Sequence, residues 1–298
     1  MKKKILFISL LFIMFLLLPQ YSQADKVGLK FSYSSNSISS GDINTWIDSY
    51  NSLWKNWQAQ KGGQLTGQFE PIAYGPSYEF ELRIPIFKGF ALNFSGTYLK
   101  AVKEGQVEYS NPSSLQNETH FVKNHVTAIP FKIGFSISVP LPIFPRLVFF
   151  AGGGRHIVFV RYQLQESYEA KFTWMGENFV YWFDRSDKLA SEALGYYASA
   201  GIELNVVQFM SVVIEAERIW TKVDGFKGSH SYTNYLDQNE GGKSSLYYYE
   251  SDQFNLGKSY PVLAGHKVRP DTSSFQNIRQ GQLNFSGLSF KFGIRFKF

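Results

Sequence analysis

Apolar and polar residues alternate strictly at both ends of the chain once its first 24 residues are set aside. From Leu288 to Phe298 every second residue is apolar, and small or basic residues fill the positions between them. Residues 26–34 show the same period. A period of two is typical of a β-strand with one apolar and one polar face. The pattern therefore predicts strands at residues 26–34 and 288–298.

The same alternation predicts six further strands, at residues 80–86, 90–98, 131–139, 147–162, 195–204 and 210–217. The phase is least certain in the segment that contains Gly152–Gly154, because these glycines permit a bulge. Links after the second, fourth and sixth strands are short, and those after the others are long. An even number of strands with short turns on one side and long loops on the other is the plan of an outer-membrane barrel.

We therefore predict an all-β fold, a closed antiparallel up-and-down transmembrane β-barrel of eight strands with long extracellular loops and one short loop helix. Segments 246–249 and 262–268 leave a count of ten strands open. The long connections include polar residues 102–120. In another connection, residues 164–190, the aromatic segments are placed to extend a hairpin beyond the main sheet.

One helix is predicted, at residues 42–58, where apolar residues recur at three- and four-residue spacing. Asp42 is placed to cap its amino end. Its aromatic stripe consists of Trp46, Tyr50, Trp54 and Trp57. Such a stripe contacts a ligand or lipid head groups, or it packs on the rim of its own domain. We favour packing.

Charged residues on the second face of the strands are expected to share one interior, because a membrane barrel turns its apolar face to lipid. They are Glu81, Arg83, Lys132, Glu203, Glu215, Glu217, Lys291 and Arg295. Opposite charges can pair there, and Glu215 and Lys291 are predicted to approach each other. An eight-strand interior is just wide enough to be filled by side chains, so a broad aqueous pore is not expected.

Residues 1–24 have the three parts of a signal peptide. Lys2–Lys4 precede an apolar run from Ile5 to Leu18, and Ser22–Ala24 supplies small residues for cleavage. The apolar run is shorter than the ~20 residues of a spanning helix. We predict cleavage after Ala24, which leaves residues 25–298 as the barrel domain. The formal charge then falls from +6 to +3, and without a long basic run nucleic-acid binding is not expected.

Composition excludes several kinds of site. The chain has no cysteine, so disulfides and thiolate metal sites are absent. No His, Asp and Glu residues stand at ligand spacing, so neither a metal nor a cofactor is predicted. The alternative function is a barrel enzyme that acts on lipid or peptide at the extracellular rim, with a base drawn from five histidines. These are His120, His125, His156, His230 and His266, and none stands in a motif with partners at fixed spacing.

Three segments carry a resemblance to a known family. The Gly195–Leu204 strand, the Glu215–Glu217 strand and the ending Ser286–Phe298 resemble the small outer-membrane barrels of OmpA and OmpW type. The resemblance implies an outer membrane of a Gram-negative-type bacterium, and Phe298 as the signal read by the barrel-assembly machinery. No peptidoglycan-binding domain follows the barrel, which departs from full-length OmpA. Fold transfers with such a resemblance and function does not.

The partners that we expect are outer-membrane lipid, the assembly machinery and a small hydrophobic or surface ligand. The expected role is non-enzymatic: support of the envelope, surface binding or passage of small solutes.

Overall fold

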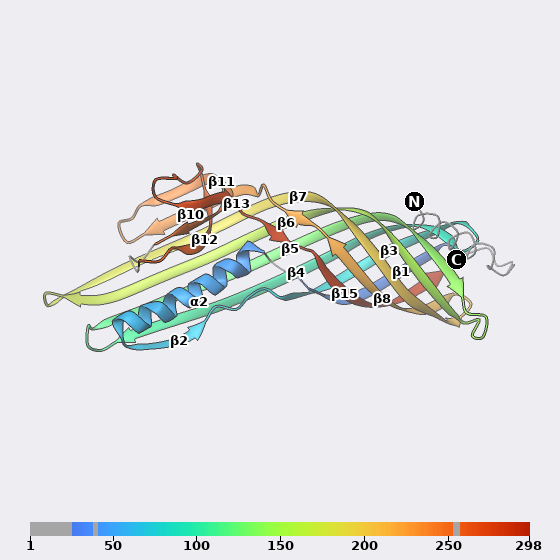
Figure 1. Ribbon diagram of the computed structural model, residues 1–298, viewed down its shortest axis with the longest axis horizontal. Helices are drawn as coiled ribbons and strands as arrows, with labels where there is room; N and C mark the ends of the chain where they lie inside the picture. Colours follow the sequence, from blue (N-terminus) through green and yellow to red (C-terminus); the bar gives the residue numbers. More distant parts are fainter. Residues whose placement is uncertain (1–25, 38–40, 253–256) are drawn as a thin grey trace, which may run out of the picture.

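Eight antiparallel strands form a closed ring in the computed structural model, which describes residues 26–37, 41–252 and 257–298 (Figure 1). The ring strands are β1 (Gly28–Ser37), β3 (Tyr74–Phe87), β4 (Phe90–Asn111), β5 (Gln116–Pro140), β6 (Leu147–Trp174), β7 (Glu177–Val207), β8 (Met210–Trp220) and β15 (Gly287–Lys297). Each pairs with its neighbour along this order, and β15 pairs with both β8 and β1, so the ring has no open edge. The predicted eight-strand closed barrel is confirmed. The predicted signal peptide lies outside the described residues.

The alternation along each ring strand sorts side chains by face. In β15, Leu288, Phe290 and Phe292 are exposed, whereas Ser289 and Lys291 are buried. Successive residues of a strand point to opposite faces, so the apolar side chains point outward and the charged ones into the ring. This is the arrangement that the sequence predicts.

Four strands continue well beyond the ring on its long-loop side, where β4 to β7 form a tall curved wall (Figure 1). The β6–β7 pair runs in register up to Trp174 and Glu177 at its tip, so the predicted hairpin extension is confirmed. Residues 102–120 were expected to form a loop, and this was wrong. They pair from Val102–His125 to Asn111–Gln116 with a turn between, because cross-strand hydrogen bonds need no apolar alternation.

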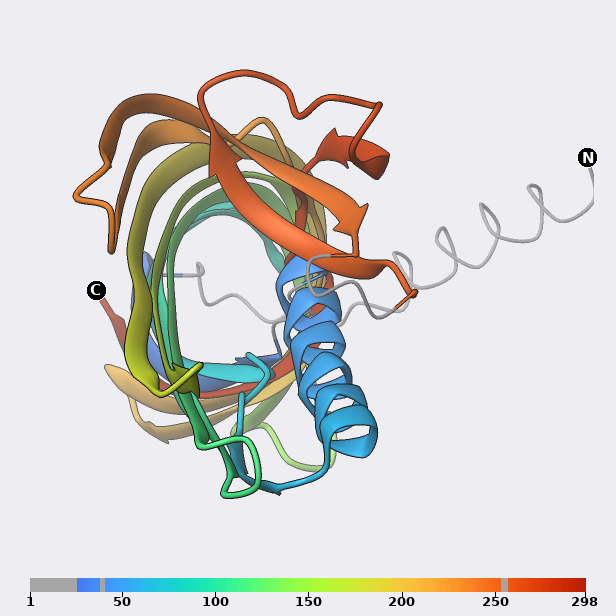
Figure 2. The ribbon, with the colours of Figure 1, turned by 90° about the vertical axis from the view of Figure 1, so that its left-hand side faces the viewer.

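The concave side of this wall is covered by elements from the long connections, and we call the whole upper part the extension. It comprises β4 and β5 between residues 99 and 128, β6 and β7 between residues 160 and 193, and the covering elements. These are α2 (Asp42–Lys61), β2 (Gln64–Gln68), β9 (Lys222–Val223), β10 (Lys227–Asn234), β11 (Asn239–Ser251), β12 (Tyr260–His266), β13 (Gln276–Gln280) and β14 (Leu283–Asn284). Figure 2 shows α2 lying across the open side of the curved wall. The segments considered for a ten-strand count fall in β11 and β12, outside the ring.

The amino end of α2 differs from the prediction. Gly41 is the N-cap residue, and Asp42 makes no capping bond. The Asp42 carboxylate instead receives two hydrogen bonds from Arg279, at 2.5 and 2.6 Å, and one from the Gln282 backbone at 2.7 Å. A guanidinium that binds both carboxylate oxygens is a stronger partner than a single backbone N–H.

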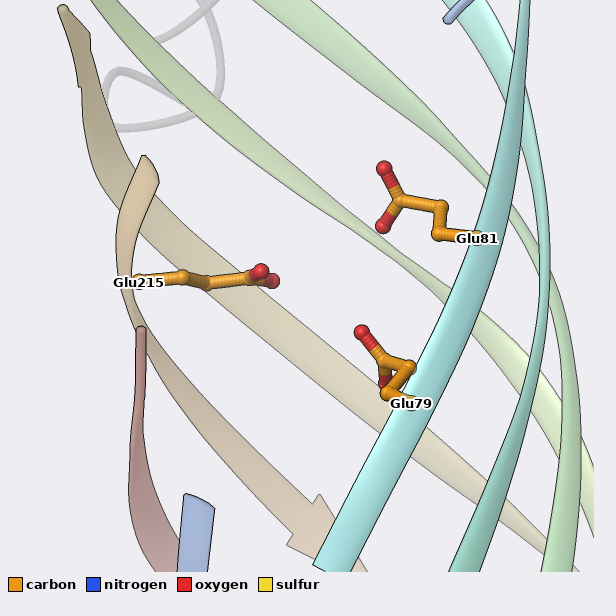
Figure 3. A group of neighbouring side chains, drawn as sticks. All are labelled: Glu79, Glu81 and Glu215. Atoms are coloured by element: carbon orange, nitrogen blue, oxygen red, sulfur yellow. The ribbon is translucent and has the colours of Figure 1, made fainter. Parts of the chain in front are cut away.

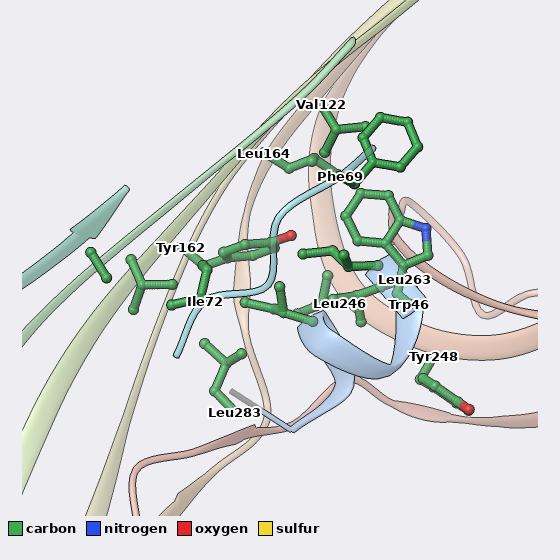
Figure 4. Packing of buried hydrophobic residues seen from close by; sticks show 14 of the residues in the cluster. Trp46, Phe69, Ile72, Val122, Tyr162, Leu164, Leu246, Tyr248, Leu263 and Leu283 are labelled. Carbon is green, nitrogen blue, oxygen red and sulfur yellow. The ribbon is translucent and has the colours of Figure 1, made fainter. Parts of the chain in front are cut away.

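An apolar core fills the space between the wall and its cover (Figure 4). Trp46 and Trp54 of α2 are each 1% exposed, and they pack in one cluster with Tyr162 and Leu164 of β6. Burial of such side chains contributes roughly 1.5–3 kcal/mol each. No helix among the described residues is both long enough and apolar enough to cross a bilayer.

Candidate functional site

The inside of the ring holds a dense network of ion pairs. All eight charged residues predicted for the interior are buried: Glu81, Arg83, Lys132, Glu203, Glu215, Glu217, Lys291 and Arg295. The structure adds Lys30 and Glu79, which the sequence list omitted. Both obey the same alternation, since Lys30 lies between outward Leu29 and Phe31, and Glu79 lies two residues before Glu81. Lys30 lies on the polar face of the strand predicted at residues 26–34 and was left out of the list, whereas Glu79 lies one residue before the strand predicted at residues 80–86.

The carboxylates of Glu79, Glu81 and Glu215 point toward one another inside the ring (Figure 3). The ammonium of Lys30 contacts all three. Its Nζ is 3.2, 2.7 and 2.5 Å from their oxygens, respectively. Oxygen atoms of the three residues lie within 4.8 Å of one another, a spacing that also suits a metal ion. The Lys30 ammonium fills that position and supplies the positive charge that the three carboxylates require.

Two further layers flank this centre. On one side Lys132 and Lys291 each bridge Glu79 and Glu217, at N–O distances between 2.6 and 2.8 Å. On the other side Arg295 joins Glu81 to Glu203. Near the short turns Lys297 also pairs with Glu203, and Arg83 donates to Ser138 at 2.8 Å. Each of these carboxylates therefore has a cationic partner inside the ring.

Glu215 and Lys291, predicted to approach each other, are directly opposite on β8 and β15. Both are buried, at 3% and 2% exposure. Their closest ion pairs nevertheless go elsewhere, from Glu215 to Lys30 and from Lys291 to Glu79 and Glu217. Long side chains in a narrow interior reach past their cross-strand neighbours, and register alone does not select the partner.

Above the charged layers the interior becomes apolar. Leu99, Ala128 and Val158 belong to the core that continues up to α2. Phe285, which follows β14, belongs to the same apolar cluster and lines the space directly above the charged layers. A cavity of about 30 Å³ lies at this boundary, beside Thr97, Lys132 and His156. Such a space is large enough for an ordered water.

A much larger cavity, about 540 Å³, lies within the extension. Its walls come from α2, from the inner faces of β5, β6 and β7, and from β10, β11 and β12. Aromatic side chains dominate the lining: Tyr50, Trp57, Tyr168, Phe172, Tyr181, Phe183, Tyr232 and Tyr249. Besides its tyrosines, the ionisable residues of the lining are Glu118, His120, Glu166 and Arg185. A concave, mostly apolar space with a few polar groups is the usual form of a ligand site.

A chain of buried polar groups runs along one wall of this cavity. His120 Nε2 lies 2.9 Å from Glu166, whose other oxygen is 3.2 Å from Arg185. Arg185 continues to Asp187 at 2.5 Å, and Asp187 meets His230 Nδ1 at 2.5 Å. Burial opposes ionisation of Glu166, but hydrogen bonding from His120 and the charge of Arg185 hold its pKa below the ordinary value. The Glu166–Arg185 pair is therefore ionised at neutral pH.

His120 is the histidine with the best geometry for acid–base chemistry, yet both ring nitrogens are engaged. Trp54 donates its indole N–H to Nδ1 at 3.3 Å. Nδ1 is therefore an acceptor, and Nε2 carries the proton donated to Glu166. A general base needs a free lone pair directed at its substrate.

The other histidines are scattered. His156 is inside the ring beside Thr221, and His125 bonds Thr127 at 3.2 Å. His230 and His266 lie on β10 and β12 of the cover, beside Asp187 and Tyr249.

The aromatic stripe of α2 divides between two environments. Trp46, Tyr50 and Trp54 are buried in the core of the extension. Trp57 is half-buried and lines the cavity. Phe298 lies at the opposite end of the molecule, where its side chain is 71% exposed and its backbone N–H donates to Val27 at 2.9 Å.

Comparisons with known proteins give little beyond these observations. No protein-family model matches the chain, and no curated protein matches it. Among solved structures, the outer membrane protein OprG from Pseudomonas aeruginosa is similar with a TM-score of 0.38 and 7% identity, over 93% of this chain and 97% of that one. That degree of likeness does not transfer a role.

Proposed function

We propose that the chain is an integral outer-membrane β-barrel protein whose extension binds a ligand at the cell surface. The observation that carries the first part is the outward face of the ring. It displays Phe31, Phe80, Phe131, Phe135, Phe149, Phe290, Phe292 and Ile294, each 44–61% exposed. Exposed apolar area of this extent is unfavourable in water and stable in lipid.

The limits of this outward band support a bilayer. On β6 the outward face from Phe149 to Phe159 carries one charged residue, Arg155, whose guanidinium lies over the Tyr196 ring at 5.5 Å. Beyond Phe159 the outward residues become uniformly polar, with Arg161, Gln163 and Gln165. The segment from Phe149 to Phe159 matches the ~9–11 residues with which a tilted strand crosses a bilayer.

An aromatic belt marks the long-loop end of the band. Tyr33, Tyr78 and Tyr98 lie side by side on β1, β3 and β4, and Tyr196 pairs with Trp220 across β7 and β8. All five are exposed. Tyr and Trp are enriched where a membrane meets water, because their rings are apolar and carry one polar group.

The proposed barrel does not conduct. The ion-pair layers fill the ring, and the apolar core follows above them. Steady passage of ions would require a wetted route, whereas the cavity at the boundary has a volume of about 30 Å³. A non-enzymatic role agrees with the engaged state of both His120 nitrogens. The chemistry of the extension therefore favours binding over passage or catalysis.

Membrane integration is tested by fractionation and by electrophoresis of unboiled and boiled samples in detergent. We expect the protein in the outer-membrane fraction and a shift in mobility on boiling, because a closed barrel resists detergent until it is heated. Identical mobility of a soluble protein would overturn the proposal.

The closed interior is tested by planar-bilayer recordings. We expect no steady conductance from the purified protein, and its presence, abolished by Glu215→Gln or Lys291→Met, would identify a channel. The enzyme alternative predicts acyl or peptide turnover that His120→Ala removes.

A further inference from the structure

We propose that the 540 Å³ cavity of the extension binds a small organic cation, with Glu118 as its counter-ion and the surrounding aromatic rings as its walls. This inference rests on the proposed ligand-binding role of the extension and names the class of ligand.

Glu118 is a buried acid that forms no ion pair within 4.0 Å among the described residues. It is 2% exposed, and its oxygens accept hydrogen bonds from Tyr168 and Gln116, each at 2.5 Å. Both donors are neutral. Among the described residues, no lysine, arginine or histidine nitrogen forms an ion pair with it at 4.0 Å or less. Burial raises the pKa of the Glu118 carboxyl, which shows the cost of leaving it uncompensated.

The other charges of the cavity wall are already matched. Glu166 has His120 and Arg185, and Arg185 has Asp187 as a second partner. Arg185, the cation of the lining, is therefore occupied by two carboxylates. An anionic ligand would meet Glu118 without a free cation, whereas a cationic ligand supplies the missing charge.

The rings around Glu118 suit a cation. Tyr168, which donates to Glu118, lies 5.9 Å from Tyr181 and 5.6 Å from Phe183 between ring centroids. Trp57 and Phe172 line the same space. Aromatic faces attract ammonium groups, most strongly when the pair is removed from water, and a cage of several rings is the usual site for a quaternary ammonium group. A volume of about 540 Å³ accommodates a ligand of roughly metabolite size.

The test is calorimetric titration of the full chain in detergent with tetramethylammonium, choline and benzyltrimethylammonium. The uncharged isostere of choline, 3,3-dimethylbutanol, is titrated in parallel. We expect at least one of the three cations to bind, and choline to bind at least tenfold more tightly than the isostere if choline is bound. Glu118→Gln keeps the side-chain shape and should weaken binding of that cation at least tenfold.

The matched control is Glu108→Gln. Glu108 also accepts a hydrogen bond from the glutamine two residues before it, Gln106, but it is exposed and faces away from the cavity. This variant should bind as the wild type does. Heat-dependent mobility is measured for every variant, so a failure to form the barrel is separated from a failure to bind.

Three results would overturn the inference while the barrel remains intact. They are no binding of any of the three cations, equal binding of choline and its isostere, and unchanged cation binding by Glu118→Gln. Equal binding of the isostere would point to a neutral ligand instead.

Discussion

The ammonium of Lys30 lies 2.5 Å from the carboxylate of Glu215, although their strands, β1 and β8, are separated by β15. The ion pair therefore connects two ring strands, β1 and β8, that share no backbone hydrogen bonds. Glu79 and Glu81, on the other side of β1, bind the same ammonium. One side chain thus links three strands across the interior.

Replacement of Lys30 tests this link. Lys30→Met leaves three buried carboxylates short of one positive charge, and breaking a buried pair in this way typically costs about 3–5 kcal/mol. We expect a lower urea midpoint for unfolding in micelles, followed by loss of heat-dependent mobility. Lys88→Met, at an exposed turn position, is the control and should leave the midpoint unchanged. Equal midpoints for the two variants would contradict the assignment.

Asp42 provides a second test, at the contact of α2 with the segment that precedes β15. Asp42→Asn removes the charged partner of Arg279, which is half exposed, so the expected loss is about 1 kcal/mol. Amide hydrogen exchange should accelerate in the first turns of α2, in β13 and at the β1–β15 seam, and remain unchanged in the rest of the ring. Glu70→Gln removes an exposed pair with Lys103 and should have no measurable effect. Uniform acceleration over the whole chain would argue against a local role.

Acid should loosen the cover of the extension through His266. Burial lowers its pKa from 6.5 to about 4, and the charges of Arg185 and His230 act in the same direction, against that of Asp187. Below pH 6.5 the unfolded cover binds a proton that the folded cover does not, so stability falls as pH decreases toward 4. The hydrogen-exchange protection factors of β11 and β12, which correct for the intrinsic pH dependence of exchange, should fall over that window.

His266→Gln should remove this part of the pH dependence, because glutamine does not titrate. Asp187 acts in the same direction, since its pKa is also depressed in the folded protein, but its contribution is lost at lower pH, below its ordinary value of 3.8. A pH profile that is identical with and without His266 would exclude His266 as the cause.

Phe298 is predicted to act during assembly and not in the finished protein. Deletion of Phe298 should reduce the fraction of heat-modifiable protein in the outer membrane. The portion that inserts should keep its ligand affinity, because the cavity lies at the other end of the molecule. Phe144→Ala removes a comparably exposed aromatic side chain from a short turn and serves as the control. Normal insertion of the deletion variant would show that Phe298 is not needed as an assembly signal.

The ring was predictable because its information is local. Each strand repeats the alternation, and the short links force neighbours to pair, so Phe290 outward and Lys291 inward follow from sequence alone. The partners of Lys291 did not follow, since they depend on how long side chains fill a shared interior. Glu79 was missed because its strand was predicted to begin at residue 80, and Lys30 was missed although it lies on the polar face of the predicted strand 26–34.

The extension was harder to predict for a different reason. Residues 102–120 pair as strands with little alternation, and the cavity joins α2 to strands more than a hundred residues away. Glu118 appears in the sequence as an ordinary polar residue. Its significance depends on Tyr168 and Gln116 as neutral neighbours, and on the absence of a cation around it among the described residues.

The ring is sealed where its first strand meets its last, at β1 and β15. Beyond that seam, the Asp42 carboxylate of α2 accepts hydrogen bonds from Arg279 and from the backbone N–H of Gln282. Both of these residues precede β15 in the chain. Separation of β1 from β15 therefore has to pull against this contact as well as against the strand hydrogen bonds. The Asp42 contact therefore stabilises the closed seam. Its loss should shorten the lifetime of the closed barrel even where the equilibrium between folded and unfolded protein changes little.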